Sequence, residues 1–279
     1  MRLEPEEIER FIDHALTEDV GRGDITTDAT IPEGTKLEVA MISRQELVVC
    51  GIDIAIATFR RLGPDCEASV LAKDGGKVGP KTVLARIRGN ARGILAAERT
   101  ALNIIQHLSG IATLTRKYAE RIEGTGATLL DTRKTIPGLR DLAKYASHAG
   151  GARNHRMRLD DGVLIKDNHI AACGSLTEAV KQAKRRVPAL TVVEVECDTL
   201  EQVGEALAAG ADMILLDNMD VSELEAAVKL AAGRALLEAS GGITLETIRA
   251  KAATGVDFVS VGSMTQSAPA VDIGLDYGA

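Results

Sequence analysis

Hydrophobic and polar residues follow two different periods along the first part of the chain. From Glu4 to Leu16, apolar residues recur every three or four positions beneath an acidic outer face, which predicts an amphipathic helix. After a segment rich in Gly, Thr and Asp, β-type runs follow at 36–43 and 46–51. Helical spacing returns at 52–62 and at 92–123. These elements predict a first domain of strands and helices.

Two details of this domain are less regular. Two β-rich runs between residues 67 and 89 flank an Asp-Gly-Gly turn, which predicts a hairpin. The Ser109-Gly110 pair marks a potential break in the long helix at 92–123, because glycine weakens a helix. We place the end of the first domain near residue 110.

The remainder of the chain alternates between apolar runs and helical stretches. Ser175 and Ser222 are each followed three residues later by Glu, a pattern that predicts helix starts. Continuous apolar runs are typical of parallel strands buried on both faces, and such βα repeats form a barrel or a doubly wound sheet. The six runs lie at 127–131, 162–167, 190–196, 212–217, 235–240 and 257–262.

Polar residues or glycines stand at the carboxyl ends of these predicted strands. In a barrel such ends form one rim around one site, whereas an open sheet spreads them along a line. This favours the barrel over the doubly wound sheet. The rim residues are Asp131, Lys166, Asp167, Glu196, Asp217, Ser240, Gly241, Gly242 and Gly262.

Composition and charge exclude some classes of protein. The 279 residues are 45% hydrophobic, a globular balance, and carry 33 Lys and Arg against 40 Asp and Glu, a net charge of −7. This acidity, with only 2% aromatic residues, argues against a nucleic-acid or membrane-surface binder.

The charge is unevenly distributed along the chain. Residues 1–33 hold ten acids and three bases, whereas 131–170 hold eight Lys and Arg, five Asp and three of the five His. A basic island in an acidic protein predicts a small anionic ligand.

Cysteine usage and the N-terminus predict a soluble cytoplasmic protein. No two cysteines have the C-x-x-C spacing of a zinc or redox site, so we interpret them as buried thiols in a reducing compartment. The start of the chain is acidic and helical, unlike a signal peptide, and no apolar run approaches the roughly 18 residues of a membrane span. The cysteines are Cys50, Cys66, Cys173 and Cys197.

The last two predicted strands end in glycine-rich turns. Segment 239–243 precedes a helix expected near Thr244, and segment 258–263 ends in the same way. Glycine lets backbone N–H groups approach phosphate oxygens, and the last two strands of a βα barrel are its usual phosphate site. The alternative is that these glycines only make tight turns.

Carboxylates and cations are expected at the same rim. Glu194 and Glu196 are two apart in one strand and face the same way, and Asp217 ends the next strand. These carboxylates suit Mg²⁺ or ribose hydroxyls, or alternatively a salt bridge inside the barrel.

The basic cluster suits carboxylate or phosphate groups, with single solvated charges as the alternative. It consists of Arg133, Lys134, Arg153, His155, Arg156, Arg158 and Lys166, with Asn154, Asn168 and His169 as neighbours that could orient it.

The segments that carry these residues closely resemble the quinolinate phosphoribosyltransferase family over nearly the whole chain. They include AERTALNIIQHLSGIAT (97–113), DTRKTIPGLRDLAKYA (131–146), GGARNHRMRLDDGVLIKDNHI (150–170) and EASGGIT (238–244). The resemblance implies an N-terminal α/β sandwich domain at 1–110. It also implies a C-terminal irregular βα barrel at 111–279, whose last residues could pack back on the first domain.

The resemblance also implies an activity, a cofactor and an assembly. Quinolinate and phosphoribosyl pyrophosphate would give nicotinate mononucleotide, pyrophosphate and CO₂ with Mg²⁺, as a step of NAD biosynthesis. The protein would be a homodimer or a higher homo-oligomer, with Arg99 reaching the partner's site.

Matching the family's motifs residue by residue assigns the following roles. Quinolinate would be bound by Arg99, Arg133, His155, Arg156 and Lys166, and the 5′-phosphate by Ser240, Gly241, Gly242 and Gly262. Lys134 would meet the pyrophosphate, and Glu196 and Asp217 would serve the ribose hydroxyls and Mg²⁺. The implied catalytic residues are Lys134, Lys166, Glu196 and Asp217.

Three other functions stay open on sequence alone. A related phosphoribosyltransferase would use another heterocycle and would release no CO₂ from quinolinate. A phosphate-binding barrel isomerase would need no phosphoribosyl pyrophosphate. A non-catalytic binding protein would be unaffected by Lys166→Ala.

Overall fold

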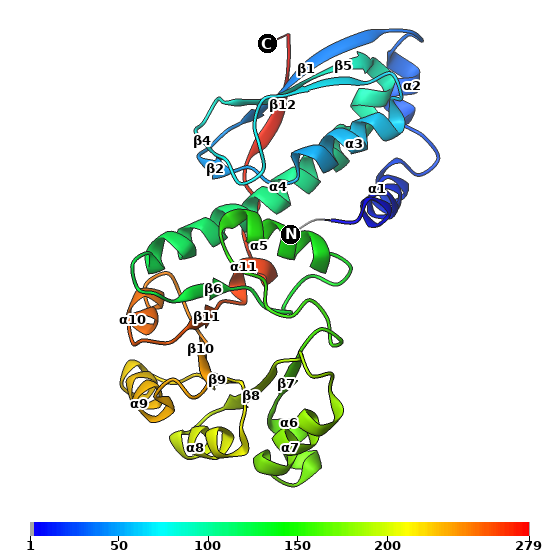
Figure 1. Cartoon of the computed structure of the whole chain (residues 1–279). Coiled ribbons are helices and arrows are strands. Elements are labelled where there is room, and N and C mark those ends of the chain that lie inside the picture. Colours follow the sequence, from blue (N-terminus) through cyan, green and yellow to red (C-terminus); the bar gives the residue numbers. More distant parts are fainter. Residues whose placement is uncertain (1–2, 279) are drawn as a thin grey trace. The chain divides into compact units, whose positions relative to one another are not determined.

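The computed structural model describes residues 3–278, which fall into two compact units (Figure 1). The first unit holds the described residues up to Arg116, together with 141–151 and those from Ser267 onward. The second holds 117–140 and 152–266. The units therefore interleave along the chain, and the sequence-based boundary near residue 110 stays a prediction.

The first unit packs helices against an antiparallel sheet, as expected for an α/β sandwich. Its four-stranded sheet has the order β12-β1-β5-β3, and β2 pairs with β4. The strands are β1 (Lys36–Ser43), β2 (Leu47–Val48), β3 (Glu67–Val70), β4 (Lys77–Val78), β5 (Val83–Asn90) and β12 (Ile273–Tyr277). The helices are α1 (Pro5–Val20), α2 (Ile25–Thr30), α3 (Ile52–Leu62), α4 (Ala91–Ile122), which runs on into the second unit, and α5 (Arg140–Gly150). Their common core includes Met41, Phe59, Leu84 and Ile94.

The structure corrects two expectations for this unit. The β-rich runs beside the Asp-Gly-Gly turn do not form a simple hairpin, because β3 pairs with β5 and β4 pairs with β2. Helix α4 is continuous through Ser109 and Gly110. The Ser109 hydroxyl accepts the Cys50 N–H at 2.9 Å, and Gly110 lets the Pro269 carbonyl approach the helix closely.

The second unit contains a parallel six-stranded sheet with helices between the strands. The strands are β6 (Thr128–Leu130), β7 (Val163–Ile165), β8 (Val193–Cys197), β9 (Met213–Asp217), β10 (Leu236–Ser240) and β11 (Phe258–Ser260). The helices are α6 (Asp167–Cys173), α7 (Leu176–Arg186), α8 (Leu200–Ala209), α9 (Val221–Ala231), α10 (Ile248–Ala252) and α11 (Ser263–Gln266).

The strand order identifies a barrel. It runs β7-β8-β9-β10-β11 in chain order, and then the first strand, β6, pairs with the last, β11. A doubly wound sheet instead reverses its order at a switch point. Leu130 of β6 also bridges to Arg153, on the side where β6 and β7 leave the ring open. The predicted irregular βα barrel is thus confirmed.

Helix starts in the barrel follow side-chain caps. Ser175 caps α7 as predicted, accepting the Glu178 N–H at 3.1 Å. The prediction for Ser222 was wrong, because Asp220 caps α9 and accepts the Glu223 N–H. The helix expected near Thr244 begins at Ile248. Among residues 3–278, no helix is long and apolar enough to cross a membrane.

Candidate active site

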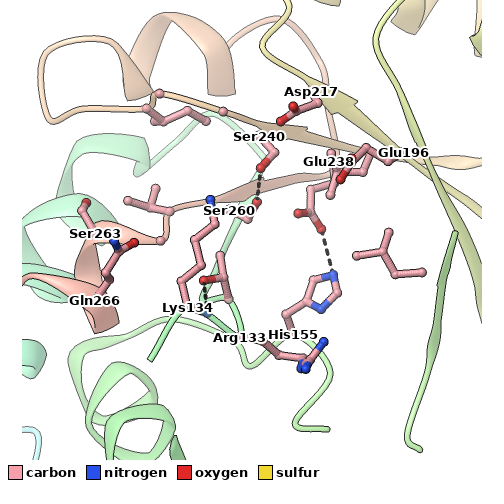
Figure 2. A pocket seen from close by; sticks show the side chains of 18 of the residues that line it. Arg133, Lys134, His155, Glu196, Asp217, Glu238, Ser240, Ser260, Ser263 and Gln266 are labelled. Carbon is pink, nitrogen blue, oxygen red and sulfur yellow. Dashed lines mark hydrogen bonds and ion pairs between the residues drawn. The ribbon is translucent and has the colours of Figure 1, made fainter. Parts of the chain in front are cut away.

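A cavity of about 520 Å³ opens at the carboxyl ends of the barrel strands. In Figure 2, Glu196, Asp217 and Glu238 lie on one side of it, and Arg133, Lys134 and His155 come from the other. The parallel strands explain this meeting, because their carboxyl ends share one rim. The predicted residues that line the cavity are Arg133, Lys134, His155, Arg156, Lys166, Glu196, Asp217, Ser240, Gly241, Gly242 and Gly262.

Two arginines form the basic wall of the cavity. The Nε atoms of Arg133 and Arg156 are buried and have no hydrogen-bond partner among residues 3–278. The other end of Arg156 is fixed, since its Nη1 donates to the Gly162 carbonyl at 2.9 Å. Burial lowers the pKa of Arg156, and the positive charge of Arg133 lowers it further. Two neighbouring guanidinium cations with unsatisfied N–H donors favour the binding of an anion.

Lysine and carboxylate side chains complete the charged lining. Lys166 forms a close ion pair with Glu196 of β8, which is the arrangement of the salt-bridge alternative. Asp217 at the end of β9 accepts a hydrogen bond from the Asn218 amide at 2.7 Å. Both carboxylates face the cavity from neighbouring strands. They are therefore placed for hydroxyl groups or a cation as well as for Lys166.

Glycines at the ends of β10 and β11 keep one end of the cavity open. Gly241 has φ +87°, and a Cβ there would lie 2.2 Å from the Asn218 Oδ1, so only glycine fits. A Cβ at Gly262 would lie 2.9 Å from the Cδ of Lys134. Beside them, the Ser260 hydroxyl donates to Ser240 at 3.0 Å (Figure 2). Close packing therefore favours glycine at both positions. The glycines also leave one end of the cavity small and polar, which suits a phosphate group.

A buried cluster of His155, Glu194 and Glu238 lies at the cavity wall. His155 Nε2 is 3.0 Å from Glu194 Oε2 and 3.5 Å from Glu238 Oε2. Burial and then the Glu194 charge raise the pKa of Glu238 to about 8. Burial and the neighbouring carboxylate thus favour the protonated form of Glu238, which lowers the negative charge of the cluster.

Several residues that line the cavity were not predicted from the sequence. Glu238 could have been found, because it stands two residues before Ser240 in β10 and shares its face, as Glu194 does with Glu196. Ser260 could have been found by the same alternation before Gly262. Ser263 and Gln266 come from the short helix α11, which had no clear sequence signal.

Some predicted residues do not line this cavity. The Arg153 guanidinium lies 6.0 Å from the centre of the Phe258 ring, and the Arg158 N–H donates to Asp161. Arg99 is exposed on α4 in the first compact unit. The rim residue Asp131 is fully buried and accepts hydrogen bonds from the Asn154 side-chain amide and the His155 backbone N–H.

The fold and the site together define a class of protein. A βα barrel whose rim joins arginines, lysines, carboxylates and glycine-rich strand ends is typical of an enzyme for phosphorylated, anionic substrates. Family models place the chain within that class. The quinolinate phosphoribosyl transferase C-terminal domain matches residues 111–276, and the N-terminal domain of the same family matches 24–109. The chain belongs to the quinolinate phosphoribosyl transferase family.

Named relatives match along almost their whole length. The chain is 44% identical to the nicotinate-nucleotide pyrophosphorylase [carboxylating] of Mycobacterium leprae, covering 95% of each chain. It is 41% identical to the probable enzyme of the same name from Bacillus subtilis, over 97% of this chain and 93% of that one. The nicotinate-nucleotide pyrophosphorylase structure from Francisella tularensis superposes with a TM-score of 0.94 at 41% identity, covering 99% of this chain and 97% of that one.

Proposed function

We propose that this protein transfers a phosphoribosyl group from phosphoribosyl pyrophosphate to quinolinate and releases nicotinate mononucleotide, pyrophosphate and CO₂, a step of NAD biosynthesis. The observation that carries the proposal is the pair of buried, unsatisfied Nε–H groups of Arg133 and Arg156 within residues 3–278. A planar dicarboxylate such as quinolinate supplies acceptors to both guanidinium groups and balances their charge. The name of the family supports this substrate, and the names of the relatives support the nicotinate nucleotide as the product.

The second substrate would occupy the rest of the cavity. Its 5′-phosphate would lie against Ser240, Gly241, Gly242 and Gly262, where small residues leave space for backbone contacts. Lys134 would face the pyrophosphate, and Glu196 and Asp217 would face the ribose hydroxyls. Lys166 would exchange part of its contact with Glu196 for a quinolinate carboxylate.

This arrangement suits a ribosyl transfer with no covalent enzyme intermediate. Positive charge develops at the anomeric carbon as pyrophosphate leaves, and the carboxylates of Glu196 and Asp217 would stabilise it. The Lys134 ammonium would stabilise the leaving pyrophosphate. After transfer, the positive pyridine nitrogen stabilises the carbanion left when the neighbouring carboxylate departs as CO₂.

We also propose Mg²⁺ as the cofactor. Glu196 and Asp217 line the same cavity and offer the oxygen ligands that Mg²⁺ prefers, so the donor set fits. The ion, when bound, would neutralise pyrophosphate charge. Glu196 and Asp217 would hold it directly, or through water or substrate.

The assembly and the compartment are further parts of the proposal. We propose a homodimer, or a higher homo-oligomer, in which Arg99 completes the partner's quinolinate site; its exposure on α4 is compatible with that role. We propose a cytoplasmic location, which the four free cysteines support.

The test is release of labelled CO₂ from quinolinate carrying the label in its 2-carboxylate. Release should require both phosphoribosyl pyrophosphate and Mg²⁺, and nicotinate mononucleotide should form in equal amount. Transfer to another heterocycle without CO₂ release would identify a different phosphoribosyltransferase. Turnover of a sugar phosphate without phosphoribosyl pyrophosphate would identify an isomerase, and either result overturns the proposal.

A further inference from the structure

Lys134 presents its ammonium group to the cavity without a counter-charge from the described chain. Its side chain extends into the cavity from the loop after β6 (Figure 2). Within residues 3–278, its Nζ atom forms no ion pair or hydrogen bond, whereas Lys166 on the same rim is paired with Glu196. A lysine side chain is long and flexible, so an unpaired ammonium is mobile unless its backbone and carbon stem are fixed. The position of this charge must therefore depend on contacts elsewhere in the residue.

The backbone of Lys134 is fixed by one hydroxyl group on each side. Its N–H donates to the Thr132 hydroxyl oxygen at 3.0 Å, and its carbonyl accepts the Thr265 hydroxyl at 2.8 Å. The Thr265 oxygen is also 3.4 Å from the Gly262 carbonyl, but its single proton favours the shorter contact. Thr265 is only 2% exposed, so water does not compete for this hydrogen bond. A buried hydroxyl in α11 therefore holds the loop that carries Lys134.

The carbon stem of Lys134 packs against the strand end that is proposed to hold the 5′-phosphate. A Cβ at Gly262 would lie 2.9 Å from the Lys134 Cδ and 3.7 Å from its Cβ. The Gly262 carbonyl in turn accepts the N–H groups of Thr265 at 3.2 Å and Gln266 at 3.0 Å, so the same glycine begins α11. Strands β6 and β11 also pair directly. Lys134 and the end of β11 thus form one packed unit.

We propose that Thr265 is a positioning residue, whose buried hydroxyl fixes the Lys134 backbone so that the ammonium faces pyrophosphate while Gly262 holds the 5′-phosphate. This inference rests on the proposed function. The two anionic ends of phosphoribosyl pyrophosphate are joined by one ribose, so the separation of the ammonium and the phosphate-binding strand end must match that substrate. A displaced ammonium would bind pyrophosphate more weakly and would also stabilise it less as a leaving group.

Two substitutions separate the hydroxyl of Thr265 from its bulk. Thr265→Val keeps the branched shape but cannot donate to the Lys134 carbonyl. Thr265→Ser keeps the donor but loses a buried methyl group. Both variants should have a lower melting temperature, one from an unsatisfied carbonyl and the other from a small cavity. Thr265→Ser is therefore the matched control for lost stability, and only Thr265→Val removes the hydrogen bond.

The two variants should differ in their affinity for inorganic pyrophosphate, measured by isothermal titration calorimetry in the presence of Mg²⁺. Thr265→Val should raise the Kd by about threefold to tenfold, and Thr265→Ser by less than about twofold. The KM for quinolinate should change by less than about twofold in both, because the Thr265 hydroxyl bonds to Lys134 and not to a group proposed to bind quinolinate. An unchanged Kd in Thr265→Val, or losses in both variants that follow the melting temperature, would overturn the proposal.

A double-mutant cycle tests whether Thr265 acts through Lys134. Lys134→Ala should weaken pyrophosphate binding by itself, and adding Thr265→Val to it should have no further effect on the Kd. A further loss of the same size as in the single variant would place the action of Thr265 elsewhere and would overturn the inference. A wild-type protein that binds no pyrophosphate would overturn it as well. Release of labelled CO₂ decides the proposed function separately, so the failure of one is distinguishable from the failure of the other.

Discussion

Arg133 and Arg156 show how single residues define this site. Each guanidinium has a buried Nε–H group with no acceptor within the described chain, and each lies near a like charge. Buried, unsatisfied donors beside a like charge cost free energy, and a ligand with two negative groups would offset that cost. The proposed specificity for a dicarboxylate rests on these two side chains.

Replacing Arg133 should mainly affect quinolinate. We expect Arg133→Ala to raise the KM for quinolinate by roughly tenfold to a hundredfold, because charge-assisted hydrogen bonds are lost. Arg133→Lys should recover only part of this, since lysine cannot form a bidentate contact. Steady-state kinetics tests both, with Arg185→Ala on the exposed surface of α7 as the matched control. A quinolinate KM that is unchanged in Arg133→Ala would refute this role.

Glu238 predicts a pH dependence of stability. Its pKa is about 8 in the folded protein and near its ordinary 4.5 when unfolded, so the folded state holds the extra proton between these values. The contribution of Glu238 to the free energy of unfolding therefore falls as pH rises from about 4.5 to about 8. Glu238→Gln keeps the shape of the protonated side chain and removes the fall in the free energy of unfolding at higher pH. Chemical denaturation should show the variant gaining on the wild type from pH 5 to pH 8.5, and a constant difference would contradict this.

Among the elements, α4 shows how tertiary contact overrides a local signal. Ser109 and Gly110 suggest a break, yet the helix is continuous through both residues. Both residues make tertiary contacts instead: the Ser109 hydroxyl accepts the Cys50 N–H, and Gly110 lets the Pro269 carbonyl come close. The same contrast appears at α9, where Asp220 rather than Ser222 provides the cap. Local motifs therefore placed α3, α4 and the start of α7 within about one residue, but at α9 they indicated the wrong capping residue.

Gly110 gives a prediction that opposes helix propensity. Alanine favours a helix by about 1 kcal/mol over glycine, but a Cβ here would lie 2.2 Å from the Pro269 carbonyl oxygen. We expect Gly110→Ala to lower the free energy of unfolding by about 1–3 kcal/mol. Gly204→Ala in α8 is the matched control, since no described atom lies within 4 Å of its added Cβ, and it should be neutral or stabilising. Similar effects in the two variants would rule out the close contact as the cause.

The sequence predicted the rim far better than the first sheet. Strands β6 to β11 follow from continuous apolar runs, and Glu196 and Asp217 follow from alternation and strand ends. Strand β12 was not predicted, because its partner β1 is more than two hundred residues away and its own five residues include a glycine. The β3–β5 pairing was missed for a related reason, since local turn signals do not report which distant strand is the neighbour. The cluster of His155, Glu194 and Glu238 required coordinates, because it depends on which side chains the folded strands bring together.

At the scale of the whole molecule, the proposed dimer makes a quantitative prediction. A mixture of Arg99→Ala and Arg133→Ala subunits forms heterodimers in which one of two sites has both arginines, if Arg99 acts in the partner's site. After full exchange of equal amounts, and with quinolinate kept well below the raised KM of the variants, we expect about a quarter of wild-type activity from two weakly active proteins. Each variant alone is the control, and exchange is verified by mass spectrometry of tagged subunits. No recovery after verified exchange would exclude action across the interface.

The pairing of β12 with β1 has a consequence for synthesis on the ribosome. One edge strand of the first sheet is made of residues 273–277, so that sheet stays incomplete until these residues have left the exit tunnel. The barrel strands end at Ser260 and are all available earlier. Until residues 273–277 emerge, the nascent chain must therefore keep the exposed edge of β1 from pairing with other chains. Synthesis of residues 273–277, rather than the folding of the barrel, would be the event that completes the first sheet.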